Sequence, residues 1–352
     1  MSGNIYERFV RPLLFQLDPE TAHHFAINLL RFTSAFAPAL AVLRSFQPPA
    51  KPRTLFGLKF PNPIGLAAGF DKNGVAIPAW EALGFGFVEI GTVTARMQPG
   101  NPRPRIFRYR EQRALINRLG FNNDGADAVA ARLARLRACG RWPKIPVGIN
   151  IGKSKAVPIE EAAGDYLESF RRLCTYADYI VINISSPNTP SLRSLQKSES
   201  LNELLPMIQE ENARTIPRRP LLVKIAPELD HEDLEEIVRA CEVHDIAGLI
   251  ATNTTVDHSA IPNARNQTGG LSGAPLLRRS TDVLQFVCKN TRLPVVASGG
   301  IFDAQTAREK LAAGAALIQI YTGYIYRGPG LLNEILRGEV REDSAERKGE
   351  AN

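Results

Sequence analysis

The segment YIVINISSPNTPSL, residues 179–192, joins a run of β-branched apolar residues to a loop of small polar side chains and two prolines. A short apolar run of this kind, bounded by turn residues, is typical of a strand buried in a parallel sheet. The prolines prevent the strand from continuing. Asn183, Ser186 and Asn188 therefore follow the end of a buried strand, where polar side chains call for a partner or a ligand.

Seven other segments show the same change from apolar strand to turn. Helical patterns such as YLESFRRLCTYA lie between most of them. Eight strands that alternate with helices predict an α/β fold, a parallel (β/α)8 TIM barrel, with an open doubly wound sheet as the alternative. The seven segments are 64–69, 87–92, 146–150, 221–227, 248–253, 294–300 and 317–323.

The first fifty residues have a different pattern, in which apolar residues recur at helical spacing among arginines. Asp18 is a candidate N-cap, and Pro19 suits the first helical turn. We expect an N-terminal helical hairpin, either packed on the main domain or lying in a membrane interface with its arginines at the headgroups. The predicted organisation is a helical region at 1–46, a Pro-rich linker at 47–53, the barrel at 54–338 and a charged, disordered tail at 339–352.

Composition narrows the class of protein. The chain has 352 residues, 44% of them hydrophobic and 22% charged, as expected for a globular protein with a large core. Its four cysteines form no C-x-x-C pair, which argues against a zinc site and favours a reducing compartment. The net charge of +7 comes partly from amphipathic helix faces such as 131–141, so we predict no nucleic-acid partner. We find no signal peptide and no run of 18 apolar residues, and expect a cytoplasmic protein that is able to bind an anionic membrane surface weakly.

Polar residues or glycines stand at the ends of the predicted strands, where the active sites of such barrels lie. The last two ends, ASGGIF and IYTGYIYRGPG, are glycine-rich and precede helical segments, so they predict a site for the phosphate of a cofactor. GINIGKS lacks the spacing of a Walker motif, and GFGF does not continue into a dinucleotide fingerprint. We see no cluster of residues with metal-ligand spacing and predict no metal.

The strand ends are rich in carboxamides and hydroxyls and carry two lysines, Lys72 and Lys224. Such a site suits a flat, amide-like anion, because carboxamides match lactam edges and lysines balance negative charge. A lysine that ends a barrel strand also allows an aldolase that forms a Schiff base on Lys224. The residue pattern alone leaves both interpretations open.

Several long motifs in one order resemble the dihydroorotate dehydrogenase family. They run from about residue 4 to 335 and include NPIGLAAGFDKNG, EIGTVTARMQPGNPRPRIFR, LINRLGFNN, INISSPNTPSLRSLQ, VKIAPEL, IATNTT, GGLSGAPL and QIYTGYIYRGPGL. The opening LDPETAHHFA resembles the quinone-dependent, membrane-associated class. A soluble relative that uses fumarate or NAD is the alternative, which the N-terminal extension and the serine at 186 disfavour.

The resemblance implies an oxidoreductase with FMN that converts dihydroorotate to orotate in de novo pyrimidine biosynthesis. Ser186 would be the base that takes a proton from C5 of dihydroorotate while flavin N5 accepts hydride from C6. Lys224 would stabilise the reduced flavin. The implied substrate-binding residues are Lys72, Asn117, Arg118, Leu119, Gly120, Phe121, Asn183, Asn188, Asn253 and Thr254. The implied FMN-binding residues are Ala68, Gly69, Thr92, Asn150, Asn183, Lys224, Thr252, Gly273, Gly300, Tyr321 and Thr322.

The same resemblance gives the N-terminal helices a role. They would lie on the cytoplasmic side of the cell membrane and enclose an apolar tunnel that leads a quinone to the flavin. His23, Arg108 and Tyr321 match positions near that quinone. The expected protein is a peripheral membrane protein and a monomer.

Overall fold

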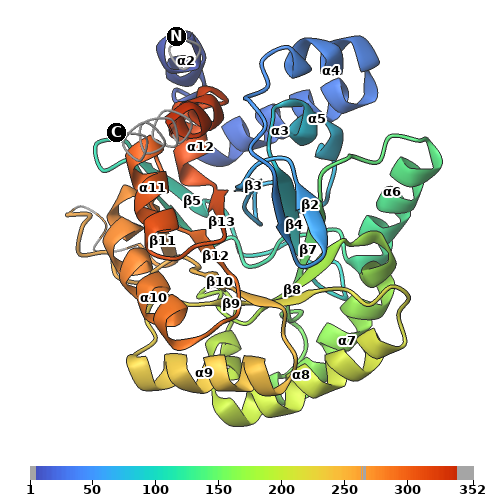
Figure 1. The fold of residues 1–352 in the computed structure, drawn as a ribbon. Coiled ribbons are helices and arrows are strands. Elements are labelled where there is room, and N and C mark those ends of the chain that lie inside the picture. Colours follow the sequence, from blue (N-terminus) through green and yellow to red (C-terminus); the bar gives the residue numbers. More distant parts are fainter. Residues whose placement is uncertain (1–4, 263, 265–266, 339–352) are drawn as a thin grey trace, which may run out of the picture.

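A computed structural model describes residues 5–262, 264 and 267–338 of the chain. Eight parallel strands form a closed barrel, and each coincides with one of the eight predicted segments, two of them extending one residue past the predicted end, so the barrel is confirmed and the open sheet is excluded (Figure 1). In order around the barrel the strands are β3 (Ile64–Leu66), β4 (Phe87–Val93), β7 (Val147–Ile151), β8 (Tyr179–Asn183), β9 (Leu221–Ile225), β10 (Gly248–Ala251), β12 (Val295–Ser298) and β13 (Leu317–Ile320).

Helices surround the strands and bury the outer face of the barrel (Figure 1). Their apolar stripes pack on the apolar strands, as the alternation of the two patterns requires. The helices are α5 (Ile77–Ala82), α6 (Ala126–Ala138), α7 (Ala162–Leu173), α8 (Ser198–Ala213), α9 (His231–Val243), α10 (Leu277–Asn290), α11 (Ala304–Ala312) and α12 (Thr322–Arg327). Short helical turns are η2 (Ile159–Glu161), η3 (Cys174–Tyr176), η4 (Leu192–Gln196) and η5 (Ala274–Leu276).

An antiparallel hairpin closes the amino end of the barrel. It consists of β1 (Arg53–Leu55) and β2 (Leu58–Phe60), so Arg53, expected in the linker, already belongs to a strand. The buried ring of Phe60 packs on Phe87 at a centroid distance of 5.4 Å, inside the start of the barrel. Access to the barrel interior is therefore from the carboxyl ends of the strands.

A three-stranded antiparallel sheet lies beside that open end. It pairs β5 (Ile106–Tyr109) with β6 (Ala114–Asn117), and β6 with β11 (Gly270–Gly273). The register places Asn117 opposite Gly270. Segments 150 residues apart in the chain thus form one wall beside the barrel mouth.

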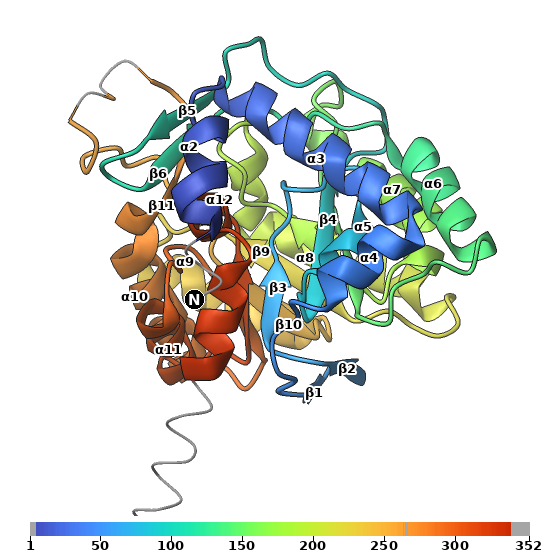
Figure 2. The same cartoon turned by 90° about the horizontal axis from the view of Figure 1, so that it is seen from above.

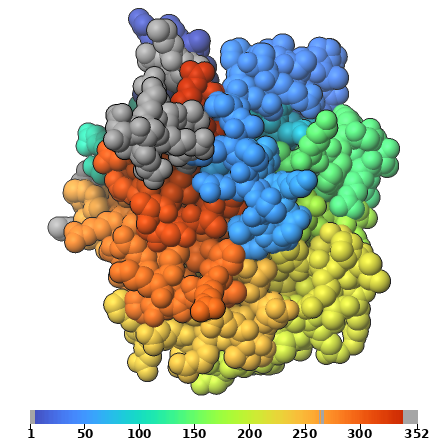
Figure 3. Space-filling view, in the orientation of Figure 1, coloured from blue at the N-terminus to red at the C-terminus, as the bar shows by residue number. Residues whose placement is uncertain are grey.

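The N-terminal extension is helical, as predicted. It contains η1 (Tyr6–Val10), α2 (Arg11–Leu14), α3 (Pro19–Ala35) and α4 (Ala37–Arg44). The predicted N-cap is confirmed, because the Asp18 carboxylate accepts hydrogen bonds from the backbone N–H groups of Glu20 and Thr21, both at 3.0 Å. Figure 2 shows these helices outside the barrel, with α2 next to α12 and α3 next to α5, and Figure 3 shows the N-terminal region, in blue, on the surface.

No single helix among the described residues is long and apolar enough to cross a membrane. The pair α3 and α4 meets that criterion only when the two are taken together, and their axes are bent by 108°. The hairpin is therefore an open bend rather than two antiparallel helices. The predicted tail at 339–352 lies outside the described residues.

Candidate active site

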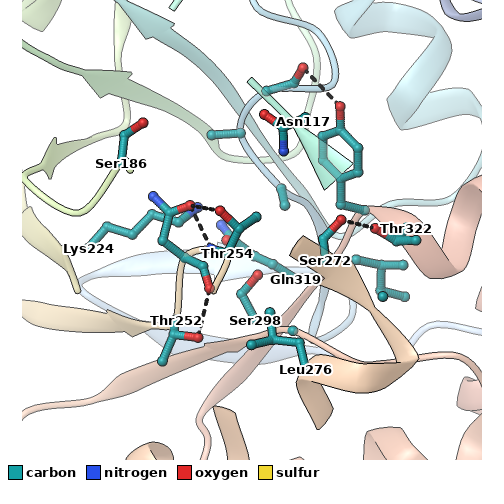
Figure 4. Close-up of a pocket in the computed structure, with 18 of the residues that line it drawn as sticks. Asn117, Ser186, Lys224, Thr252, Thr254, Ser272, Leu276, Ser298, Gln319 and Thr322 are labelled. Atoms are coloured by element: carbon teal, nitrogen blue, oxygen red, sulfur yellow. Dashed lines mark hydrogen bonds between the residues drawn. The ribbon is translucent and has the colours of Figure 1, made fainter. Parts of the chain in front are cut away.

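A polar cavity opens at the carboxyl ends of the barrel strands. Every barrel strand except β7 contributes lining residues, either from its last positions or from the loop that follows. Figure 4 shows Ser186 and Lys224 on one side of this cavity and Ser272 and Thr322 on the other. The cavity thus has two ends of different chemistry.

The loop after β8 brings the hydroxyl of Ser186 into the cavity. The side chain is 5% exposed, and its Oγ accepts a hydrogen bond of 3.3 Å from the backbone N–H of Asn188. Within the part of the chain that the structure describes, this is the one hydrogen bond to Ser186 Oγ. The hydroxyl hydrogen therefore remains available to a ligand in the cavity.

Carboxamides from separate loops converge around Ser186. Asn188 Nδ2 donates to the side-chain oxygen of Asn117 at 3.2 Å and to its backbone oxygen at 3.1 Å. Asn253 Nδ2 donates to Ser185 Oγ at 3.0 Å. These mutual bonds hold the planes of the amides in place and leave other donors and acceptors for a planar, amide-like ligand.

A buried polar network lies beneath the same end of the cavity. Lys224 is 5% exposed, and its Nζ lies 3.7 Å from Glu89 Oε1, which also accepts a 2.8 Å hydrogen bond from Asn150 Nδ2. Gln319 donates to the other oxygen of Glu89. The ion pair with Glu89 holds the Lys224 side chain in place, whereas a Schiff base requires a lysine that is free to attack a carbonyl carbon, so the network disfavours the aldolase.

The second lysine, Lys72, lies after β3 and donates to Asn122 Oδ1. Burial, together with the charge of Arg105 and against the opposing charge of Glu20, lowers the pKa of Lys72 to about 7. The neighbouring Asp71 accepts backbone hydrogen bonds from Val75 and Ala76, both at 2.8 Å, so its carboxylate stabilises the turn. Lys72 is therefore the cation that the β3 loop offers to an anionic ligand.

Glycine-rich turns form the opposite end of the cavity. Gly300 has φ +79°, and a Cβ there would lie 2.3 Å from Leu277 Cα, so a larger residue would not fit. Among the described residues, the backbone N–H groups of Gly299, Gly300 and Gly323 have no acceptor. Ser272 and Thr322 add two hydroxyls, 2.8 Å apart. Unpaired donors from the turn after β12 and from the start of α12 match the oxygens of a phosphate.

One of the two helices expected to bind that phosphate is already capped. The Asp303 carboxylate accepts a 2.8 Å hydrogen bond from the backbone N–H of Thr306 in a capping box at the start of α11. A carboxylate at this helix N-terminus takes the place of a phosphate. The available donors belong to the turn before α11 and to the first residues of α12.

A second, apolar cavity of about 300 Å³ lies between the barrel and the N-terminal helices. His23 and Arg108 line it, and Arg108 Nε is buried without a hydrogen-bond partner among the residues that the structure describes. Burial lowers the pKa of His23 to about 3, so its ring is neutral at physiological pH. Asn117, Ser272 and Tyr321 line both cavities. The polar and apolar cavities therefore share one wall.

The comparison with protein families identifies this architecture. The family model of dihydroorotate dehydrogenase matches residues 52–341, which is most of the chain. The chain belongs to the dihydroorotate dehydrogenase family. The resemblance noted in the sequence motifs is thereby confirmed.

Dihydroorotate dehydrogenases of the quinone type are among its relatives. The chain is 52% identical to dihydroorotate dehydrogenase (quinone) of Gloeobacter violaceus over 333 residues, which cover 94% of this chain and 92% of the relative. It is 50% identical to the protein of the same name from Chloroflexus aurantiacus, with 94% and 95% covered. The crystal structure of the Eimeria tenella enzyme in complex with ferulenol has a TM-score of 0.83 and 34% identity, with 94% and 95% of the chains covered.

Most of the residues that the dihydroorotate dehydrogenase motifs single out lie together. All of those expected to bind substrate or FMN line the polar cavity, with two exceptions. Asn150 lies behind it, bonded to Glu89 and Thr92. Arg118 points away, donates to Pro104 O at 2.9 Å and lines an outer surface pocket. His23, Arg108 and Tyr321 line the apolar cavity, as expected for a quinone tunnel.

Sequence reasoning missed several polar residues of these cavities or of the network beneath them, Ser298 of the polar cavity among them. Glu89 is fully buried in β4, and its only signal is an acid inside the apolar run FVEIGT. Ser272 and Gln319 line the polar cavity from β11 and β13. Gln319 alternates with apolar residues in LIQI, which is the signal of a side chain that points into the barrel.

Proposed function

We propose that the chain is a quinone-dependent dihydroorotate dehydrogenase with FMN as its cofactor, which oxidises dihydroorotate to orotate in pyrimidine biosynthesis. The observation that carries this proposal is the wall shared by two cavities of opposite character. One cavity offers amides, hydroxyls and a lysine to a small polar anion, and the other is apolar. An enzyme that joins a water-soluble donor to a lipid-soluble acceptor needs this arrangement.

The residues present fit FMN. The unpaired N–H groups of Gly299, Gly300 and Gly323 suit its phosphate, and the glycines leave room for close approach. Lys224, placed by Glu89, suits the end of the ring system that gains negative charge. Bound FMN would supply a two-electron carrier that is reduced in the polar cavity and oxidised from the apolar one.

In this proposal, Ser186 is the base that accepts the proton from a carbon atom of dihydroorotate. A serine is a weak base at its ordinary pKa, so it needs a site without bulk water and a fixed orientation. Ser186 is nearly fully buried, and the N–H of Asn188 fixes its oxygen. Lys72 would bind the carboxylate of dihydroorotate, and the carboxamides of Asn117, Asn188 and Asn253 would bind the edges of its ring.

The apolar cavity would bind the quinone. Arg108 has a buried Nε–H without an acceptor, and its guanidinium lies 4.1 Å from the ring centre of Phe15. A carbonyl oxygen of a quinone would satisfy that donor, since an unpaired buried donor costs about 1–3 kcal/mol. Neutral His23 contacts Phe70 at a centroid distance of 5.4 Å and offers a second polar atom in the same cavity.

The surface around this cavity suits a membrane. Nine apolar side chains of the N-terminal region are each at least 55% exposed, which is unusual for a soluble domain. They are Ile5, Phe9, Leu13, Phe25, Leu29, Phe32, Phe36, Val42 and Phe46. We propose that they lie in the acyl boundary of the cytoplasmic side of the cell membrane, with the protein attached as a peripheral monomer.

An anaerobic titration tests the function. The purified protein should show a flavin spectrum, lose its visible absorbance on addition of dihydroorotate and regain it with a short-chain quinone. Recovery with fumarate or NAD instead would place the protein in the soluble class. A colourless protein would contradict the use of FMN altogether.

A further inference from the structure

Lys310, in α11, is a buried cation outside both cavities. Its side chain is fully buried, and its Nζ donates to Ser280 Oγ at 2.6 Å and to the backbone oxygen of Leu277 at 3.4 Å. Within the described chain, no carboxylate forms an ion pair with it. Glu309 and Asp282 act on its charge only from a distance. A buried charge without a counter-charge is costly, and an apolar side chain would fill this space without that cost.

The contacts of Lys310 lead directly to the glycine end of the polar cavity. Ser280 Oγ lies 3.2 Å from the backbone oxygen of Gly299 and 3.1 Å from that of Leu277. A Cβ on Gly299 would lie 2.9 Å from Ser280 Oγ, so the turn packs closely on this serine. Lys310 is therefore separated by a single side chain from the turn whose N–H groups have no acceptor.

We propose that Lys310 is the buried counter-charge and positioning residue for the phosphate group of the flavin. It acts through Ser280 and the Gly299–Gly300 turn and does not itself line the cavity. The inference rests on the proposed use of FMN, since the phosphate is the anion that the lysine lacks. Burial lowers the pKa of Lys310 to about 7, so its charge is only weakly held until a dianion is near.

The test compares FMN with riboflavin, which has the same ring system and no phosphate. The full-length protein is freed of flavin, and the dissociation constant for each flavin is measured by fluorescence quenching. We expect Lys310→Met to raise the dissociation constant for FMN about tenfold, the effect of one charge on another in a partly buried site, and to leave that for riboflavin within about twofold.

Lys153→Met is the matched control. Lys153 is also buried, at 3% exposed, and also donates to backbone oxygens, those of Ser154 and Val157, but it lies after β7. We expect it to leave both dissociation constants unchanged. If Lys310→Met is not obtained as folded protein, Ser280→Ala should lose affinity for FMN and retain affinity for riboflavin.

The flavin affinities of the Lys310→Met variant distinguish a role at the phosphate from a role in packing. Equal loss of both flavins in Lys310→Met, with folding intact, would mean that the lysine only packs and would overturn the inference. An unchanged affinity for FMN would overturn it as well. If the unaltered protein binds neither flavin, the proposed function itself fails. A shifted phosphorus resonance of bound FMN in the Lys310→Met holoenzyme would confirm that the change is felt at the phosphate.

Discussion

Ser186 is the side chain whose replacement tests the chemistry most directly. Its oxygen has one N–H donor and faces the polar cavity. We expect Ser186→Ala to lower turnover of dihydroorotate by about 10²–10⁴-fold at neutral pH, the contribution typical of a general base. FMN should remain bound, because the residues proposed to bind it lie elsewhere in the cavity. Steady-state rates of the purified variant measure its turnover, and its visible spectrum shows whether FMN is bound.

The same loop supplies the control for this variant. Ser194 is an exposed serine in η4 whose hydroxyl donates to Ser191 O at 2.7 Å. Ser194→Ala should turn over at the rate of the unaltered protein. Turnover by Ser186→Ala at that same rate would remove Ser186 from the mechanism.

Lys72 predicts how binding of the product depends on pH. Burial lowers its pKa from the ordinary lysine value to about 7, and only the ammonium form attracts the carboxylate of orotate. As pH rises through that value the ammonium is lost, so affinity falls. We expect the dissociation constant for orotate to rise about tenfold per pH unit above pH 7.5, since each bound anion then requires one proton.

Equilibrium titration of orotate between pH 6 and 8.5 measures this effect without turnover. Lys72→Ala should bind orotate weakly at every pH and show no change of slope near pH 7. A dissociation constant that is constant with pH in the unaltered protein would mean that Lys72 does not bind the carboxylate.

At the residue scale, sequence reasoning succeeded where a polar side chain interrupts an apolar pattern. Ser186, Lys224 and the carboxamides at strand ends were found in that way, and the structure brings them to one cavity. Glu89 was missed because one acid inside a strand gives no indication of the residues that face it across a barrel. Arg118 follows Asn117 directly, and adjacent residues of a strand point in opposite directions.

Among the elements, α3 is held to the segment before β5 by a buried ion pair. Glu20 accepts hydrogen bonds from Arg105 at 2.8 and 3.1 Å, and both side chains are 7% exposed. Burial raises the pKa of Glu20, but the bonds from Arg105 and the charge of Arg103 outweigh it and lower the pKa overall. The pair therefore stabilises the docked helix above the ordinary pKa of glutamate, and this stability is lost as pH falls through the lowered value.

We expect Glu20→Gln to destabilise the docking of α3 by about 3 kcal/mol, because it leaves the guanidinium of Arg105 buried without its counter-charge. Amide hydrogen exchange measures this loss of docking, and we expect faster exchange in Glu20→Gln that is confined to α3 and α4. Glu210→Gln removes an exposed pair with Arg214 and should cost less than about 1 kcal/mol. Equal exchange rates in the two variants would contradict the role of the Glu20–Arg105 pair.

The elements that sequence patterns identified are those defined by local periodicity. All eight barrel strands match predicted segments, with β4 and β7 one residue longer at the end, because each is a compact apolar run with a clear end. The sheet of β5, β6 and β11 was not predicted, since its strands are four residues long and pair across 150 residues of chain. The bend of 108° between α3 and α4 depends on packing against the barrel and was likewise not readable from their composition.

For the whole molecule, the exposed apolar surface predicts binding to lipid vesicles. Phe32 and Phe36 are 70% and 55% exposed and do not line the apolar cavity. We expect the double variant Phe32→Ser, Phe36→Ser to lower the partition coefficient onto anionic vesicles about tenfold or more, since each buried aromatic side chain contributes about 1.5–3 kcal/mol. Sedimentation with vesicles measures the partition coefficient. Turnover of the double variant with a short-chain quinone should match that of the unaltered protein.

Two exposed apolar residues of the barrel provide the control. Ile216 and Val243 are 94% and 70% exposed and belong to the α8–β9 loop and to α9, away from the N-terminal helices. The double variant Ile216→Ser, Val243→Ser should sediment with vesicles like the unaltered protein. If it loses binding as strongly as the Phe32, Phe36 variant, the membrane surface is not the N-terminal one.

The wall formed by Asn117, Ser272 and Tyr321 also has a consequence for inhibition. Because the two cavities open separately, neither substrate has to leave before the other approaches the protein. A compound that fills the apolar cavity would compete with the quinone, yet added dihydroorotate would not relieve it. Double-reciprocal plots against dihydroorotate should then give parallel lines at increasing inhibitor. Inhibitors that act in this way would be directed at the lining that α2 and α3 supply to the apolar cavity rather than at the polar cavity.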